Sequence, residues 1–443
     1  MVVTGRFVAF VAVGVVPVVV FGALAPSAAG PVLVAWLLLC IAIVMVDALL
    51  APRPSGLKLS RVLPARVRLG ESVTAELVVT NTGRRRVRGV LRDAWQPSAG
   101  ASTSRQRIDL PGGERRMLTL RLTPLRRGER RVEFVVLRSL GPLGVAGRQA
   151  RIDAPGRIRV LPPFTSRKHL PSRLARLREL DGRTAVMVRG QGTEFDSLRE
   201  YVRGDDVRSI DWRATARQGS PVDAPQRLMV RTWRPERDRR VVIVVDSART
   251  SAARVDDEPR IDTAFEASLL LAALASHADD RVDLLVWDRR VRGRVQGAAG
   301  AELLSRMVDA MAPIEPELIE ADWAGVPALV RQATSGHALV VLITSIEAPG
   351  AASGMLAMLP QLTRRHRVLV ASVTDPTALR SVGDRHDLEG VYRAASAERA
   401  LLDVARVSAA IRRLGADVVT GSPADLPPAL ADRYIALKAA GQL

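Results

Sequence analysis

Two long apolar runs stand at the beginning of the chain. No residue is charged from Phe7 to Ala25, and none is charged from Pro31 to Val46. The residues between them, 26–30, are small or proline. A helix needs about 20 apolar residues to cross roughly 30 Å of hydrocarbon. The pattern therefore predicts two transmembrane helices joined by a tight turn in residues 1–52.

The charges around these runs predict how they are oriented. The turn carries no charge, whereas Arg53, Lys58 and Arg61 follow the second run. By the positive-inside rule both ends face the cytoplasm, and the body of the protein is expected on the inner face of the plasma membrane. Asp47, at the inner edge of the second helix, is predicted to reach the headgroup region. A cleaved signal peptide is the alternative for the first run, but it leaves the second run unexplained.

Residues 53–162 alternate apolar and polar positions in short segments. Examples are SVTAELVVTNTG, RRMLTLRLTP and RRVEFVVLRS, which are separated by turn signals such as Asn81-Thr82-Gly83. A period of two with a turn about every ten residues is typical of an antiparallel β-sandwich of immunoglobulin size. No nucleophile with a neighbouring base occurs in this segment, so we expect it to have a structural role.

The rhythm changes in residues 239–443, where continuous apolar strands alternate with helices. The strands are RRVVIVVDSA, RVDLLVWD, HALVVLITS, RVLVASVTD and ADVVTG, and the helices are expected at 261–277, 302–311, 322–334, 355–365 and 397–414, with one more at the end. This order predicts an α/β domain of the Rossmann type with a mostly parallel sheet. Ligands of such sheets bind at the carboxyl ends of the strands. Here those ends carry Asp246, Ser247, Asp288, Thr344, Ser345 and Asp375.

Composition and motifs exclude several classes of enzyme. The chain has no phosphate-binding loop and no nucleophile elbow, one cysteine, and five histidines without paired spacing. We therefore expect no catalytic residue and no enzymatic activity. The net charge of +19 is carried almost wholly by arginine, which would suit nucleic acid or anionic lipid. The arginines are nevertheless spread over all segments, so nucleic acid is not the expected partner.

The stretch VVDSARTS, after the first strand of the α/β domain, resembles the start of a von Willebrand factor type A domain. In that family a D-x-S-x-S pattern helps to bind a hard cation such as Mg²⁺ through oxygen ligands. Asp246 matches the aspartate and Thr250 can replace the second hydroxyl, but Ala248 stands in place of the first. A degenerate site is therefore expected, with no bound cofactor, and Mg²⁺ binding at Asp246 and Thr250 is the alternative.

A dense run of acids and arginines, GTEFDSLREYVRGDDVRSIDWRATAR, extends from Gly192 to Arg217. It lies within residues 163–238, which we interpret as a linker followed by a signature segment. The run resembles the signature of the family called domain of unknown function fifty-eight. The element RSLGPLGVAGRQ likewise resembles the family's DPLGL element, with Gly141 in place of the aspartate. The residues expected to act together are Glu194, Arg199, Glu200, Tyr201, Gly204, Asp205, Asp206, Arg208, Asp211, Trp212 and Arg217.

The resemblance implies a function but no catalytic residue. Genes of this family often lie beside genes for MoxR-type AAA+ ATPases and for membrane proteins with transglutaminase-like domains. The products of these neighbouring genes are therefore the suspected partners. We expect a membrane-tethered scaffold or adaptor that works with such an ATPase in protein assembly or maturation. The alternative is a membrane-localised binder of nucleic acid or anionic lipid.

Three interpretations of the signature remain open. It is a clasp of buried ion pairs, a surface for a partner, or, with least support, a catalytic carboxylate pair. The clasp requires Asp211 and Arg208 to be paired and buried.

Overall fold

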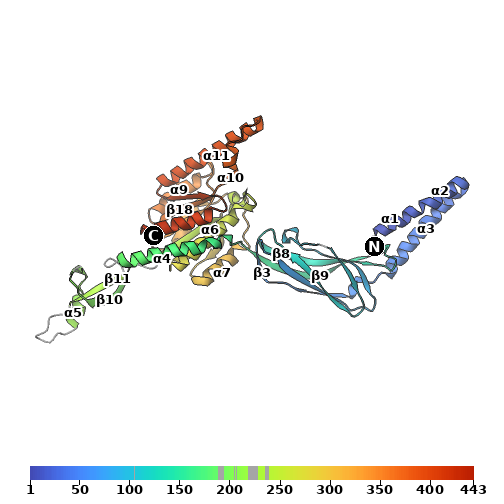
Figure 1. Ribbon diagram of the computed structural model, residues 1–443, viewed down its shortest axis with the longest axis horizontal. Coiled ribbons are helices and arrows are strands. Elements are labelled where there is room, and N and C mark those ends of the chain that lie inside the picture. The colour runs from blue at the N-terminus through green and yellow to red at the C-terminus, as the bar shows by residue number, and fades with distance from the viewer. Residues whose placement is uncertain (104, 188–193, 204, 206, 218–227, 235–238) are drawn as a thin grey trace. The chain divides into compact units, whose positions relative to one another are not determined.

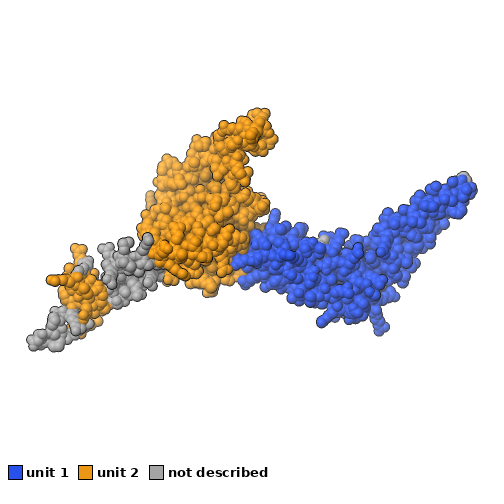
Figure 2. Space-filling model, viewed as in Figure 1, with its two compact units in different colours: residues 1–161 blue, residues 162–443 orange. Residues whose placement is uncertain are grey.

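The structure is a computed structural model that describes the chain except residues 104, 188–193, 204, 206, 218–227 and 235–238 (Figure 1). The chain divides into two compact units, residues 1–161 and 162–443 (Figure 2). This division falls one residue before the predicted end of the β domain. Each unit has buried hydrophobic clusters of its own.

The first unit begins with apolar helices. They are α1 (Gly5–Val13), α2 (Val15–Leu24) and α3 (Pro26–Leu50). The segments 5–24 and 27–56 are long and apolar enough to cross a membrane. The turn lies at Ala25 and not over residues 26–30 as predicted, because Pro26 begins α3. Proline suits the first position of a helix, where its missing N–H needs no partner.

Asp47 attaches the end of α3 to the β-rich part of the same unit. Its side chain is fully buried. One carboxylate oxygen accepts the N–H of Leu143, and the other accepts the N–H groups of Val145 and Ala146, each at 2.8 Å. The prediction that Asp47 reaches the headgroup region is therefore wrong. The loop 141–146 offers several backbone donors to one anion, which favours burial of the carboxylate.

The β-rich part consists of two sheets that share apolar cores. One sheet has the order β1-β9-β8-β5-β6, with β3 also paired to β9, and the other has the order β2-β4-β7. The strands are β1 (Val2–Val3), β2 (Leu57–Val62), β3 (Arg66–Arg68), β4 (Val73–Asn81), β5 (Val87–Asp93), β6 (Arg105–Leu110), β7 (Arg115–Leu122), β8 (Gly128–Leu140) and β9 (Ala146–Leu161). Leu77 and Val79 of one sheet pack with Leu91, Val135 and Leu137 of the other. The sheets are antiparallel as predicted, except that β3 runs parallel to β9.

The second unit contains a six-stranded sheet of order β16-β15-β12-β17-β18-β19. These strands are β12 (Arg240–Asp246), β15 (Arg281–Trp287), β16 (Val291–Val295), β17 (Leu339–Ile343), β18 (Arg367–Val373) and β19 (Asp417–Gly421). All neighbours pair in parallel except β16, which is antiparallel to β15. Strands β12 and β17 are almost wholly buried because helices cover both faces of the sheet.

The helices of this unit include all those expected from the sequence. Outside the signature segment they are α4 (Leu170–Met187), α6 (Arg260–His277), α7 (Gly300–Met311), α8 (Val326–Ala333), α9 (Ser353–Thr363), α10 (Pro376–Ser381), α11 (Leu388–Arg413) and α12 (Leu426–Ala439). Helices α8, α9 and α11 pack on one core cluster with the sheet. Two differences stand out. Helix α4 occupies a segment interpreted as a linker, and α11 begins nine residues earlier than predicted.

Candidate functional site

The signature segment forms a small antiparallel hairpin with one short helix. Strand β10 (Glu194–Glu200) pairs with β11 (Met229–Arg234), and the chain between them includes η4 (Val207–Ser209) and α5 (Trp212–Arg217). Helix α5 is tied to β11, because the hydroxyl of Thr215 accepts the N–H of Met229 at 3.0 Å. The signature is thus a folded unit and not an extended loop.

Asp211 organises the beginning of α5. One oxygen accepts the N–H groups of Arg213 and Ala214 at 3.0 Å, which is the arrangement of a helix N-cap. The other oxygen accepts a bond from Arg231 on β11 at 2.6 Å. The Ala214 N–H, together with Arg231, holds the pKa of Asp211 below its usual value. Both carboxylate oxygens take part in structural hydrogen bonds. A general base instead needs a free oxygen and a pKa near the working pH.

Asp205 organises the preceding turn in a similar way. Its carboxylate accepts one hydrogen bond from the guanidinium group of Arg199 at 2.6 Å and another from the N–H of Val202 at 3.0 Å. The Asp205 N–H in turn donates to the carbonyl of Val202. This turn fixes the direction in which the chain leaves β10 for η4.

The expectation that Asp211 and Arg208 are both buried is wrong. Asp211 is largely buried, with 12% of its side chain exposed, but its partner is Arg231, which lies outside the signature. Arg208 is exposed on η4. While one oxygen of Asp211 caps α5, its second oxygen is free to accept the bond from Arg231 on β11.

The other signature residues fall into three groups. Tyr201 is half-buried, whereas Glu200, Trp212 and Arg217 are exposed. Gly204 and Asp206 lie outside the described residues, and so does the side chain of Glu194.

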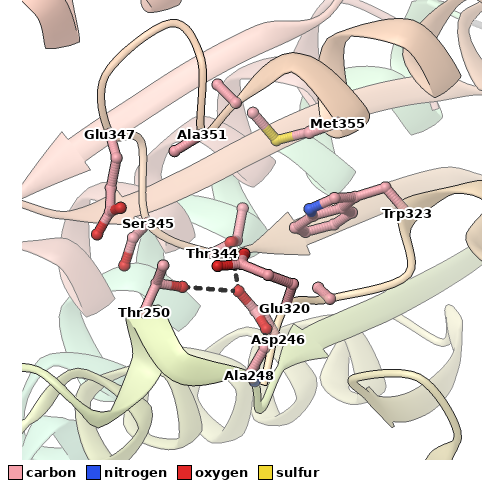
Figure 3. A pocket seen from close by; sticks show the side chains of 12 residues that line it. Asp246, Ala248, Thr250, Glu320, Trp323, Thr344, Ser345, Glu347, Ala351 and Met355 are labelled. Atoms are coloured by element: carbon pink, nitrogen blue, oxygen red, sulfur yellow. Dashed lines mark hydrogen bonds between the residues drawn. The ribbon is translucent and has the colours of Figure 1, made fainter. Parts of the chain in front are cut away.

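The carboxyl ends of the central strands meet at one edge of the six-stranded sheet, as the sequence predicts. Asp246 ends β12 and is buried. One of its oxygens accepts the N–H of Ala248 at 2.8 Å. The other accepts the hydroxyls of Thr344 at 2.7 Å and Thr250 at 3.2 Å (Figure 3). Burial raises the pKa of Asp246, although these hydrogen bonds oppose the change.

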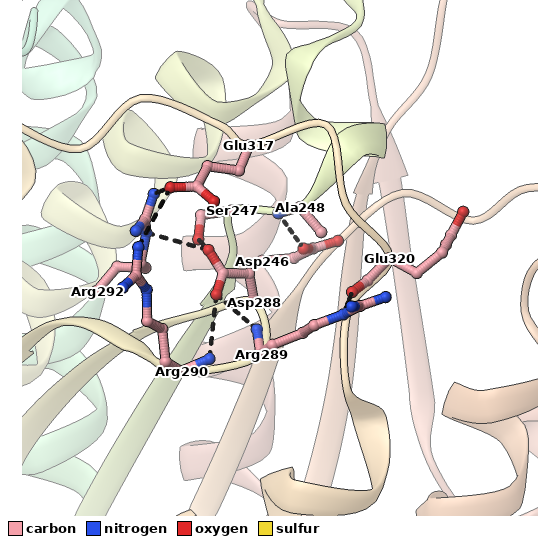
Figure 4. A network of polar contacts seen from close by, with 9 residues as sticks. All are labelled: Asp246, Ser247, Ala248, Asp288, Arg289, Arg290, Arg292, Glu317 and Glu320. Carbon is pink, nitrogen blue, oxygen red and sulfur yellow. Dashed lines mark hydrogen bonds and ion pairs between the residues drawn. The ribbon is translucent and has the colours of Figure 1, made fainter.

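Asp288 forms a second network after β15, beside Asp246 (Figure 4). It is fully buried and accepts the backbone N–H groups of Arg289 and Arg290. It also contacts the Ser247 hydroxyl at 3.3 Å and the Arg292 guanidinium at 3.1 Å. Arg292 also forms an ion pair with Glu317. Asp375, after β18, caps α10 through the N–H of Thr377. All three strand-end aspartates therefore bond to groups of the protein itself.

A pocket opens over Asp246 at this edge (Figure 3). Thr344, Ser345 and Glu347 lie on one side of it, and Trp323 and Met355 supply an apolar wall. Arg260 of α6 approaches the same rim from the side, 3.1 Å from the Ser345 hydroxyl and 3.4 Å from Glu347. The pocket combines hydroxyls, carboxylates and an aromatic ring, which suits recognition of a side chain of another molecule.

The residues around Asp246 do not fit a magnesium ion. Mg²⁺ requires near-octahedral oxygen ligands at about 2.1 Å. Ala248 supplies no oxygen from its side chain, and Arg260 brings a positive charge to Ser345 and Glu347. Within the described part of the chain, no group of three or more His, Cys, Asp or Glu residues could hold a metal. Asp246 and Thr250 are instead bonded to each other.

We expect Asp246→Asn to fold and to be at least as stable as the wild type at neutral pH. The new amide oxygen can accept the Ala248 N–H, and its NH₂ can donate to Thr344 and Thr250, whose hydroxyls can also accept. Because the folded-state pKa is raised, the aspartate contributes stability that is fully present below about pH 4 and is lost as pH rises through the folded pKa. Thermal unfolding over this pH range should show the wild type losing stability relative to the variant.

Adding Mg²⁺ tests the same prediction from the other side. We expect no rise in the melting temperature of either protein, since a bound ion would stabilise the fold by mass action. A rise for the wild type that is absent in Asp246→Asn would contradict the account of this edge.

Several residues of these networks were not found by sequence reasoning. Arg231, Arg260 and Glu317 belong to no motif and lie 20 or more residues from the side chains that they contact. Trp323, which lines the pocket, also belongs to no motif. Only their place in the folded chain identifies them.

Comparison with known proteins finds a family match and curated relatives for this chain. The model of the family described as Protein of unknown function DUF58 matches residues 197–413. Uncharacterized protein Mb1516 of Mycobacterium bovis and Uncharacterized protein Rv1480 of Mycobacterium tuberculosis are each 30% identical over 263 residues, which cover 57% of this chain and 80% of the relative.

The solved structures are more distant. The SpRpn10 VWA domain is 8% identical, covers 44% of this chain and 94% of its own, and has a TM-score of 0.28. Salmonella alpha-2-macroglobulin reacted with methylamine is 19% identical over 24% of this chain and 7% of its own, with a TM-score of 0.20. The family match and the mycobacterial relatives lead to one conclusion: the chain belongs to the family of proteins of unknown function DUF58.

Proposed function

We propose that the protein is a membrane-tethered adaptor that binds protein partners at the carboxyl edge of its α/β sheet. The supporting observation is the pocket over Asp246, in which the carboxylate is satisfied by three internal donors. Such a group is ill suited to transfer protons or to hold a metal. The rim of Ser345, Glu347 and Trp323 remains available for contact with another protein.

The fold and the charges support the domain types and the membrane anchoring in this proposal. A parallel sheet with one antiparallel edge strand, and with Asp246 at the end of a central strand, supports a von Willebrand factor type A-like domain. The two sheets of the first unit support an immunoglobulin-sized sandwich. The apolar segments 5–24 and 27–56 support anchoring in the plasma membrane. Arg53, Lys58 and Arg61 after the second segment favour a cytoplasmic body.

The proposed partner is a MoxR-type AAA+ ATPase, and the process is the assembly or maturation of other proteins. A binder of nucleic acid or anionic lipid receives less support from the described surface. Many of its arginines are paired with carboxylates, among them Arg86 with Asp109, Arg131 with Glu129 and Arg385 with Glu398. Paired arginines contribute less to the attraction of phosphate.

An arginine placed on the pocket rim tests the proposal. Ala351 lines the pocket and is exposed, so Ala351→Arg adds a large charged side chain without removing a described contact. Binding of the full chain in nanodiscs to the purified MoxR-type ATPase of the same organism would be measured by biolayer interferometry. We expect Ala351→Arg to weaken binding about tenfold or more, as blocking an interface centre does.

The matched control is Ala301→Arg, which makes the same change on the exposed surface of α7. It should leave binding unchanged, and wild-type binding should vary little between about 50 and 200 mM salt. Equal loss in both variants, or no binding of the wild type, would reject the pocket as the partner site. A steep salt dependence together with binding to DNA or anionic vesicles would favour the alternative function.

A further inference from the structure

The signature hairpin exposes a set of large apolar side chains. Val202, Val207 and Trp212 are 61%, 65% and 66% exposed. They lie after β10, on η4 and at the start of α5. Backbone hydrogen bonds from Tyr201 to Leu228 and from Asp211 to Met229 hold these segments beside β11. The exposed side chains therefore stand on an ordered frame.

Three exposed arginines lie near these apolar residues in the sequence. Arg203, Arg213 and Arg217 are exposed. The carboxylates of Asp205 and Asp211 are turned into the hairpin, with 20% and 12% of their side chains exposed. Of the acidic residues described between 198 and 217, Glu200 is the exposed one. The exposed side chains described in this segment are thus mainly apolar or basic.

We propose that Val202, Val207 and Trp212, with Arg203, Arg213 and Arg217, form a docking surface for an acidic segment of another protein that carries apolar side chains. Tryptophan and arginine are the residues that most often dominate binding at protein interfaces. Guanidinium groups give bidentate bonds to carboxylates, which adds charge complementarity to the burial of the apolar groups. None of these residues lines the pocket over Asp246, so the inference goes beyond the proposed function.

A protein occupant suits these residues better than a nucleic acid or a lipid surface. Stacking of bases requires aromatic rings, whereas two of the three apolar residues are valines. A peptide with alternating carboxylate and aliphatic side chains can meet both the arginines and the valines.

Defined probes can test this surface on the full chain in nanodiscs of neutral lipid. The probes are three labelled peptides in which leucine alternates with glutamate, glutamine or lysine, together with oligo-dT and vesicles containing phosphatidylglycerol. We expect the glutamate peptide to bind most tightly by fluorescence anisotropy. Trp212→Ala and the double variant Arg213→Ala/Arg217→Ala should each weaken its binding about tenfold or more.

The control is the double variant Arg116→Ala/Met117→Ala, which removes an exposed arginine and an exposed apolar residue from β7. It should bind the glutamate peptide as the wild type does. The proposal is overturned if no peptide binds, if the glutamine or lysine peptide binds equally well, or if the signature variants lose binding to oligo-dT or vesicles instead. These outcomes are independent of Ala351→Arg, so this surface and the sheet-edge pocket succeed or fail separately.

Hydroxyl-radical footprinting asks whether another part of the chain covers the surface. Trp212 should be oxidised rapidly in the full chain, whereas Trp287, which is 8% exposed, supplies the slow reference. If Trp212 is oxidised as slowly as Trp287, the proposal of a docking surface is wrong, and the interpretation of the signature as a buried clasp is favoured.

Discussion

Asp47→Ala is expected to lower the free energy of unfolding of the first unit by about 3 kcal/mol or more, since each buried N–H left without a partner costs about 1–3 kcal/mol. The wild-type carboxylate accepts three N–H groups from the loop 141–146, and an alanine accepts none. Water cannot readily replace it, because Asp47 is fully buried. Differential scanning fluorimetry of the full chain in detergent would report the change as a lower melting temperature.

Two further variants show whether hydrogen bonding causes the effect. Asp47→Asn keeps one acceptor oxygen but turns an NH₂ group toward a donor, so its loss should lie between those of the wild type and Asp47→Ala. Asp109→Ala removes a partly exposed aspartate from the same unit, and its solvent-exposed ion pair with Arg86 should contribute little to stability. Faster amide exchange at Val145 and Ala146 should accompany Asp47→Ala. Equal stability of the alanine variants at positions 47 and 109 would disprove the anchoring role.

The same contact explains the glycine at position 141. A Cβ added to Gly141 would overlap the carbonyl and the carboxylate of Asp47. The resemblance to the family's element places an aspartate at this position, whereas here the carboxylate next to the loop comes from α3. Asp47 and Val145 are 98 residues apart in the sequence. Neither residue alone therefore indicates the contact, and a helix-end aspartate is predicted to face the headgroups.

Hydrophobic patterning predicts the elements that fill the core, and it fails where a helix has little apolar surface to bury. Helix α6 was predicted within one residue because 15 of its residues, from Ile261 to Ala275, are buried. The first turns of α11 were missed because Leu388 and Tyr392 are exposed and only Gly390 and Ala394 face inward. Helix α4 was missed because its many arginines gave it the appearance of a linker.

The sequence also predicts which residues of the candidate sites belong together, but not how they are paired. The parallel order of β15, β12 and β17 brings Asp288, Asp246 and Thr344 to one edge, as the ends of their strands require. Their hydrogen-bond partners lie mostly in the loops that follow the strands. The sequences of these loops have no periodic pattern from which their paths could be predicted. The same holds for Asp211, whose partner Arg231 is 20 residues away on the second strand of the hairpin.

Lys438→Met is expected to destabilise the second unit by about 3–5 kcal/mol, the usual cost of removing one partner of a buried ion pair. The ammonium of Lys438 lies 2.8 Å from the carboxylate of Asp280, whose side chain is 1% exposed, and it also donates to the carbonyl of Ala278. Tyr434 donates to the same carboxylate. Methionine has nearly the same aliphatic volume as lysine, so no cavity is expected. The loss of stability therefore measures the cost of leaving the buried charge of Asp280 without its partner.

A double-mutant cycle separates the charge from the packing. Asp280→Asn added to Lys438→Met removes the stranded charge and keeps an acceptor for Tyr434, so it should restore a large part of the lost stability. Arg306→Met breaks an exposed pair with Glu302 and should change the free energy of unfolding by less than about 1 kcal/mol. If Lys438→Met proves as mild as Arg306→Met, or if Asp280→Asn deepens its effect, the pair does not hold α12 to the end of α6 as its geometry requires.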